Sequence, residues 1–162
     1  MTMKKRYFFY LWIAVTSYMA GPAMYALTMY ILYQETDVVT TSLIGWTTAT
    51  FLSVGILFIL IIVIMLRVFN IYYFWLQTLL FELLFLALVY MTAVFLGAGN
   101  TGLPKLSFPF TPDGVSLWMF WGSIALMSSW GIWAARQPIR KSPYMLVSRV
   151  ILILFILEIW PR

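Results

Sequence analysis

The sequence contains neither cysteine nor histidine, and only five of its 162 residues are acidic. Without cysteine the chain has no disulfide bond, no thiolate nucleophile and no thiol relay across a membrane. Without histidine it lacks the usual haem ligand, histidine-based metal sites and a general base with an ordinary pKa near neutrality. These absences exclude disulfide-shuttling membrane oxidoreductases and argue against haem-bearing subunits, and we expect no cofactor and no metal.

The scarcity of charge indicates the environment of the chain. Charged residues make up 9% of the sequence and hydrophobic residues 64%, with a mean hydropathy of +0.96. A soluble domain typically has about 25% charged and about 45–50% apolar residues. The apolar excess is too large for one globular core, so the composition predicts an integral membrane protein in contact with the lipid bilayer. Eight tryptophans and ten tyrosines suit a protein with two membrane interfaces.

Apolar runs of about 20 residues, long enough to cross a hydrocarbon layer of about 30 Å, predict a bundle of five transmembrane helices. They form a single domain over residues 1–162, without a soluble domain. The first run is too long for a signal peptide and is predicted to be a retained span. It contains Gly21 and Pro22, where loss of a backbone donor predicts a kink. The predicted spans are residues 7–33, 43–66, 71–96, 115–135 and 144–160.

The fifth run is short and contains Arg149 and Glu158, so two interpretations are open. It is either a fifth span or a helix lying in the inner leaflet after four spans. An interfacial helix gathers its polar residues on one face. Arg149 and Glu158 are nine positions apart and point in opposite directions at about 100° per residue, which favours the fifth span and an extracytoplasmic C-terminus.

The basic residues indicate the orientation of the chain. Cytoplasmic loops carry an excess of lysine and arginine, and a cytoplasmic N-terminus places seven of the ten basic residues inside. The outer loops then hold Lys105 with Glu35, Asp37 and Asp113. This distribution explains the net charge of +5 without nucleic acid, and we expect a multi-pass protein of a bacterial cell membrane. The seven inner residues are Lys4, Lys5, Arg6, Arg67, Arg136, Arg140 and Lys141.

The longest loop, residues 97–114, contains three prolines and four glycines, which predict turns and extended stretches. Its segment Phe108–Phe110 is expected to rest on the outer headgroup layer. A lid or partner-docking loop is the alternative.

One carboxylate, Glu82, lies in the apolar run LLFELLF near the centre of its predicted span. A charged side chain there costs about 2.5–3.5 kcal/mol, so we expect Glu82 to face the bundle interior. Thr78 lies one turn earlier on the same face, and Ser53 and Ser123 fall at similar depth. Arg149 is the candidate countercharge, about 9 Å away in depth at 1.5 Å per residue. This intramembrane polar site either fixes helix register or carries a proton or cation.

Small residues in the fourth span, Gly122, Ala125 and Ser129, are expected to form a packing stripe. Enzyme classes fit poorly, because Asp37 and Asp113 lie in loops, no acidic cluster could hold a metal, and no lysine lies in a span. We therefore predict a non-catalytic subunit or accessory component of a membrane protein complex, which binds other membrane subunits or a second copy of itself. The alternative is a small oligomeric transporter or channel that uses Glu82 for proton or cation coupling.

Overall fold

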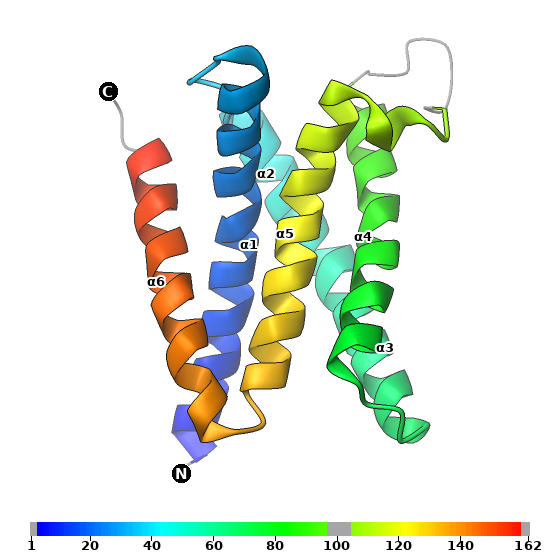
Figure 1. The fold of residues 1–162 in the computed structure, drawn as a ribbon, viewed down its shortest axis with the longest axis vertical. Coiled ribbons are helices and arrows are strands. Elements are labelled where there is room, and N and C mark those ends of the chain that lie inside the picture. The colour runs from blue at the N-terminus through cyan, green and yellow to red at the C-terminus, as the bar shows by residue number, and fades with distance from the viewer. Residues whose placement is uncertain (1–2, 97–104, 160–162) are drawn as a thin grey trace.

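The computed structural model, which describes residues 3–96 and 105–159, is all-α, with five long helices running up and down (Figure 1). Three of the five, Thr41–Val68, Phe74–Phe95 and Pro112–Ala134, are long and apolar enough to span a membrane. They indicate a multi-pass membrane protein. The elements are α1 (Met3–Tyr33), α2 (Thr41–Thr50), the π-helical segment η1 (Phe51–Gly55), α3 (Ile56–Val68), α4 (Phe74–Phe95), the 3-10 turn η2 (Phe108–Phe110), α5 (Pro112–Ala134) and α6 (Pro138–Ile159).

The predicted helices are all present, with α2, η1 and α3 forming one continuous helix. The largest difference is at the fifth, because α6 begins at Pro138 rather than at residue 144. Its first turn carries Arg140, whose guanidinium lies 3.9 Å from the centroid of the Trp133 ring. The two termini lie at opposite ends of the bundle (Figure 1). Residues 97–104 of the predicted loop lie outside the described residues, and so does Trp160.

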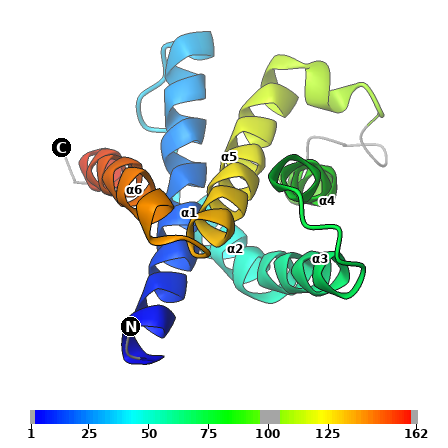
Figure 2. The same ribbon diagram turned by 60° about the horizontal axis from the view of Figure 1, so that its bottom comes forward.

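Helix α5 lies at the centre of the fold and packs against α1, α4 and α6 (Figure 2). Between α4 and α5 the core contains Phe85 and Trp121, both almost completely buried, with ring centroids 6.0 Å apart. The indole N–H of Trp121 donates a 2.8 Å hydrogen bond to the hydroxyl of Thr92 on α4. The interface therefore combines aromatic packing with a buried polar contact.

Helix α1 continues through Gly21 and Pro22 without a break. Gly21 faces α5, because a Cβ atom added there would lie 2.8 Å from Ile124 Cδ1 and 3.1 Å from Phe120 Cε1. The glycine thus allows close approach of two helix backbones, a use of small residues that is common between membrane helices. This contact gives Gly21 a packing role that is separate from the predicted kink.

The α2–α3 helix contacts both α1 and α4 through its first half and α4 through its second. On α2, the Tyr18 hydroxyl of α1 lies 3.0 Å from the Thr47 hydroxyl and accepts a 2.7 Å hydrogen bond from Thr48. The other half, α3, packs against α4. Between them, η1 adds a local π-type turn, which inserts an extra residue into an otherwise regular helix.

The start of α5 is capped and tied to α1. Thr111 accepts a hydrogen bond from the Gly114 N–H over 3.2 Å, and Pro112 occupies the first turn, where its missing donor costs little. A side chain at Gly114 would overlap the carbonyl of Phe108, so only glycine fits between η2 and α5. The Tyr33 hydroxyl at the end of α1 donates a 2.7 Å hydrogen bond to Asp113.

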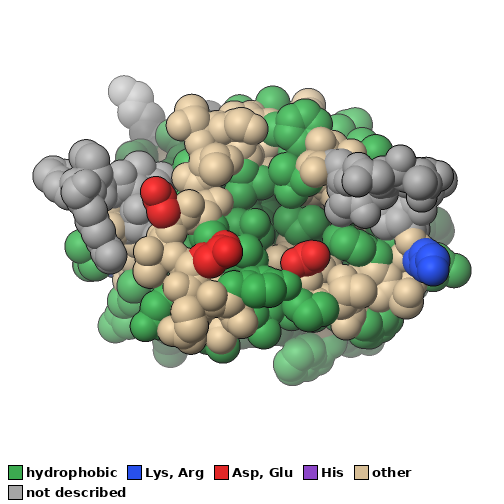
Figure 3. Space-filling model, turned by 90° about the horizontal axis from the view of Figure 1, so that it is seen from above, with side chains coloured by type: hydrophobic (Ala, Val, Ile, Leu, Met, Phe, Trp, Pro, Cys, Tyr) green, Lys and Arg blue, Asp and Glu red, His purple; other side chains and the backbone are tan. Residues whose placement is uncertain are grey.

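The two ends of the bundle differ in charge. Acidic side chains gather around an apolar depression at the upper end, with one basic side chain at the edge (Figure 3). The opposite end, where α3 finishes and α6 begins, carries Arg67, Arg136, Arg140 and Lys141. The guanidinium of Arg136 lies 3.0 Å from the centroid of the Tyr72 ring. This asymmetry agrees with the predicted orientation, which itself stays a prediction.

Candidate functional site: an open groove along α5

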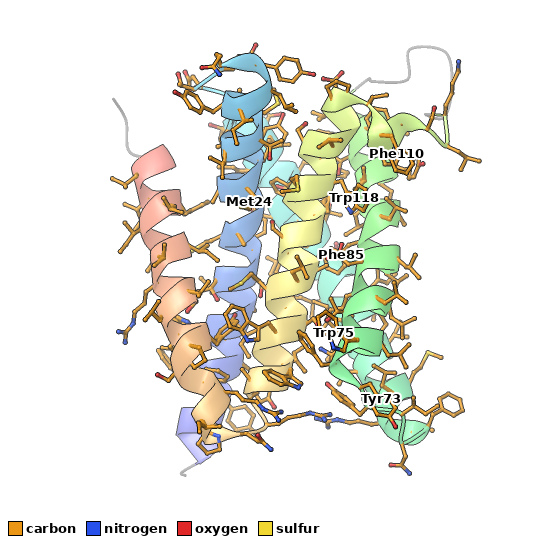
Figure 4. All side chains as sticks on the ribbon, in the orientation of Figure 1. Met24, Tyr73, Trp75, Phe85, Phe110 and Trp118 are labelled. Carbon is orange, nitrogen blue, oxygen red and sulfur yellow. The ribbon has the colours of Figure 1, made fainter. Side chains whose placement is uncertain are left out.

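An open groove of about 1270 Å³ follows the exposed face of α5, between α4 on one side and α1 with α6 on the other. It extends from Glu35 and Thr36, just beyond the end of α1, to Trp133 near the end of α5. Figure 4 labels two of its lining residues, Met24 on α1 and Trp118 on α5. Most of the lining is apolar, and Glu82 supplies a carboxylate between the two ends.

Glu82 reaches the groove from α4 and packs against Gly122 of α5. A Cβ atom added to Gly122 would lie 3.1 Å from Glu82 Oε2 and 3.5 Å from Trp118 Nε1. A side chain at position 122 would therefore press against the carboxylate, which would have to shift by a few tenths of an ångström. Trp118 is its hydrogen-bonding neighbour. Glu82 is half-buried, so one side of the carboxylate is held by α5 and the other is open to the groove.

A buried polar cluster locks α4 to α5 one turn away from Glu82. Gln77 Nε2 donates to the carbonyl and to the hydroxyl of Ser129, both over 3.0 Å. The Thr78 hydroxyl lies 2.7 Å from the Ser129 hydroxyl and also donates to the Phe74 carbonyl. Within the described ranges Gln77 Oε1 has no hydrogen-bond partner. These contacts fix the register of the two helices and thereby the position of Glu82.

The residues predicted to form the polar site are only partly brought together. Glu82 and Ser123 both line the groove, whereas Thr78 is buried beside it in the Ser129 cluster. Ser53 lies on the exposed side of η1 and donates to a carbonyl of its own helix. Arg149 is exposed on α6, and in the described part of the chain no cation acts on the Glu82 carboxylate.

Sequence reasoning gave Gln77 and Trp118 no role at the site. Gln77 and Thr78 are adjacent polar residues within an apolar run, and this pattern could have indicated a polar contact with a neighbouring helix. Trp118 had no comparable signal, because tryptophans occur throughout the chain. Gly122 and Ser129 of the predicted stripe do lie in the α4–α5 contact.

Within residues 3–96 and 105–159, no three acidic residues converge on a point that could hold a metal ion, and the two carboxylates that line the groove, Glu35 and Glu82, lie on the loop after α1 and on α4, respectively. No family model matches the chain, and no curated protein or solved structure is detectably similar to it. The function is therefore inferred from the groove and its carboxylates.

Proposed function

We propose that the chain is a non-catalytic subunit or accessory component of a membrane protein complex, and that the groove along α5 is where a transmembrane helix of the complex binds. The observation that carries this proposal is the half-buried position of Glu82 in the wall of an open, apolar groove. A carboxylate facing lipid is costly. A partner helix that covers the groove and offers a polar or basic group would relieve that cost.

The dimensions of the groove suit such a partner. Its volume of about 1270 Å³ exceeds the roughly 300–1,000 Å³ that is usual for small-molecule pockets. It is also open along its length and extends from Glu35 to Trp133, so it would leave one side of a small ligand in contact with lipid. A helix about 10–12 Å wide lies naturally in a groove of this kind.

In this proposal α1 and α6 cross the membrane together with the three candidate spans. The N-terminus is cytoplasmic, and the C-terminus is outside. The basic end of the bundle, with Arg67 and Arg136, then faces the cytoplasm, and the acidic end, with Glu35 and Asp113, faces outward. This arrangement follows the excess of positive charge in cytoplasmic loops.

A small oligomeric transporter is the second candidate, favoured by one observation. The groove places Glu82 in one continuous space with Glu35 at its outer end, as a carboxylate path for protons or cations would. Against it, Glu82 and Glu35 are the only acidic residues among the described lining residues. Proton pathways usually use a chain of ionisable groups.

Photo-crosslinking in native membranes tests the proposal. A photoreactive residue replaces Leu126 in the groove, or Ile64 on α3 as the control; these side chains are 52% and 57% exposed. We expect Leu126 to capture a protein and Ile64 to capture lipid. Capture of lipid alone at both positions contradicts the proposal. Proton flux in liposomes that Glu82→Gln abolishes, with helical content unchanged, would support the transporter instead.

A further inference from the structure

The outward face of α6 carries an apolar stripe interrupted by a single charge. Leu146, Arg149, Val150 and Ile153 are all exposed, and their spacing of three, four and seven residues places them on one helical face. An arginine on a lipid-exposed face costs energy unless its long side chain reaches the headgroups or finds a partner. A group that accepts hydrogen bonds from a guanidinium would therefore stabilise this face.

Helix α4 carries the same pattern with the opposite charge. Leu79, Glu82, Leu83 and Leu86 repeat the spacing of the α6 stripe, and all four are exposed or half-buried. Among them Glu82 lines the groove, whereas Leu83 lines a separate depression between α3 and α4. The two faces thus match position by position, apolar against apolar and carboxylate against guanidinium. Since α4 and α6 run in the same direction through the bundle (Figure 1), two such faces can pair in parallel.

The central helix α5 allows the heights of α4 and α6 to be compared. Thr78 of α4 is level with Ser129, to which it is hydrogen-bonded. Tyr144 of α6 is level with Gly131, where an added Cβ atom would lie 3.0 Å from the Tyr144 ring carbon Cζ. Two residues of helix separate these levels by about 3 Å. Thr78 and Tyr144 therefore lie at nearly the same depth.

The charged residues lie at similar distances beyond Thr78 and Tyr144 along their helices. Glu82 follows Thr78 by four residues, and Arg149 follows Tyr144 by five, which is about 6 Å and about 7.5 Å along the respective helices. Both helices rise toward the same end (Figure 1). Glu82 and Arg149 therefore lie at the same depth to within about one helical turn of 5.4 Å.

The two groups do not meet within one chain. Helix α6 packs on α1 and α5, whereas α4 packs on α5 and α3, so the two lie on opposite flanks of α5 (Figures 1 and 2). Arg149 lies on the exposed face of α6, whereas Ile151 and Leu154 of the same helix line the groove. Copies of the chain inserted in the same orientation, however, present Glu82 and Arg149 to each other at a common depth.

We propose that α6 of a second copy binds along the exposed face of α4 at the edge of the groove, with the partner subunit's Arg149 paired to Glu82. This inference rests on the proposed function, because it names the partner. The contact joins two different surfaces and is head-to-tail, so repetition of it generates a ring or an open chain of subunits. An Arg–carboxylate pair withdrawn from water is a strong, directional contact, and it would remove two lipid-exposed charges at once.

Disulfide trapping tests the proposed contact, and the natural lack of cysteine makes every introduced thiol unique. Leu79→Cys and Leu146→Cys each lie three residues before the charged residue of their face. Two differently tagged single-cysteine chains are expressed in one membrane and oxidised mildly. We expect the mixed 79–146 product to exceed the 79–79 and 146–146 products at least tenfold, and Ile64→Cys on α3 to give no product with either. Dominance of a like-with-like product overturns the head-to-tail arrangement.

Charge reversal then tests the ion pair across the two chains. Adding Glu82→Arg to the Leu79→Cys chain should reduce the mixed product at least tenfold. Adding Arg149→Glu to the Leu146→Cys chain as well should restore it, which a folding defect in either chain cannot do. Glu82→Gln, the milder change, should reduce the product several-fold, and helical content by circular dichroism checks each variant. Failure of the double reversal to restore the product overturns the pair.

The outcomes separate the two proposals. If Leu126 captures a different protein in the photo-crosslinking experiment and no 79–146 disulfide forms, the subunit function stands and the self-association is wrong. If the chain is monomeric in lipid and captures no protein at Leu126, both are wrong. A 79–146 product that follows the charges supports the self-association, and the proton-flux measurement with Glu82→Gln then separates the subunit function from the oligomeric transporter.

Discussion

Replacing Gly21 with alanine tests whether α1 is held against α5 by direct glycine contact. The new Cβ atom would meet Ile124 Cδ1 at 2.8 Å and Phe120 Cε1 at 3.1 Å. Both neighbours are at most 1% exposed, so they have little room to move. Overpacking of this kind costs about 1–3 kcal/mol, while alanine recovers up to about 1 kcal/mol of helix propensity. We expect a net loss of about 1 kcal/mol in the free energy of unfolding.

The same contact predicts a specific rescue. Ile124→Val removes the Cδ1 atom that lies closest to the new Cβ, and by itself should cost about 0.5–1.5 kcal/mol. In that background Gly21→Ala should cost less than it does alone, because the closest contact is gone while those at 3.0 Å to Cγ1 of residue 124 and 3.1 Å to Phe120 Cε1 remain. The coupling free energy between the two substitutions should then be about 0.5 kcal/mol or more, within the range found for residues in contact.

The measurement is unfolding of the detergent-solubilised protein by titration with a denaturing detergent, followed by circular dichroism. Gly45→Ala is the matched control, since no atom lies within 4 Å of the Cβ position on that helical glycine. It should be neutral or stabilising. Strict additivity of Gly21→Ala and Ile124→Val would refute the packing explanation and return Gly21 to a role in the kink predicted with Pro22.

Two further predictions concern the core and the topology. Trp121→Phe removes the hydrogen bond to Thr92 and should lower the free energy of unfolding by about 0.6–1.7 kcal/mol, the average to the maximum found for polar contacts between membrane helices. In the same unfolding assay, Thr92→Val should add little to the loss once the tryptophan is gone. Full additivity of the two substitutions would contradict the hydrogen bond. A reporter enzyme that is active only outside the cytoplasm should be active when fused to the C-terminus and inactive when fused to the N-terminus. An inactive C-terminal fusion that is expressed normally would favour four spans and an interfacial α6.

Helix positions could be read from the sequence because its apolar runs are long, and each predicted span overlaps a helix of the structure. Three of these helices are long and apolar enough to span a membrane. The start of α6 could not be read, because Pro138, Arg140 and Lys141 resemble a loop. Proline is tolerated in the first turn of a helix. Cations at this end of the bundle lie over aromatic rings, as Arg140 does over Trp133.

The candidate site was less predictable, for a related reason. Helices that are apolar on every side have no periodic pattern to show which face is buried. The sequence could therefore indicate that Glu82 lies in the middle of a helix, but not that it faces a groove instead of the bundle interior. Its surroundings depend on the register of α4 against α5, which Gln77, Thr78 and Ser129 set through contacts 51 or 52 residues apart in sequence.

The η1 segment has a consequence for how the two halves of its helix can move. The half of the helix before it, α2, is hydrogen-bonded to Tyr18 of α1. The half after it, α3, packs on α4, which follows it in the chain. The first half also contacts α4, through the Trp46 ring stacked on Phe95 with centroids 4.7 Å apart. A local change of twist at this π-type turn would therefore move α3 against α4 while leaving the Tyr18 contacts of α2 in place.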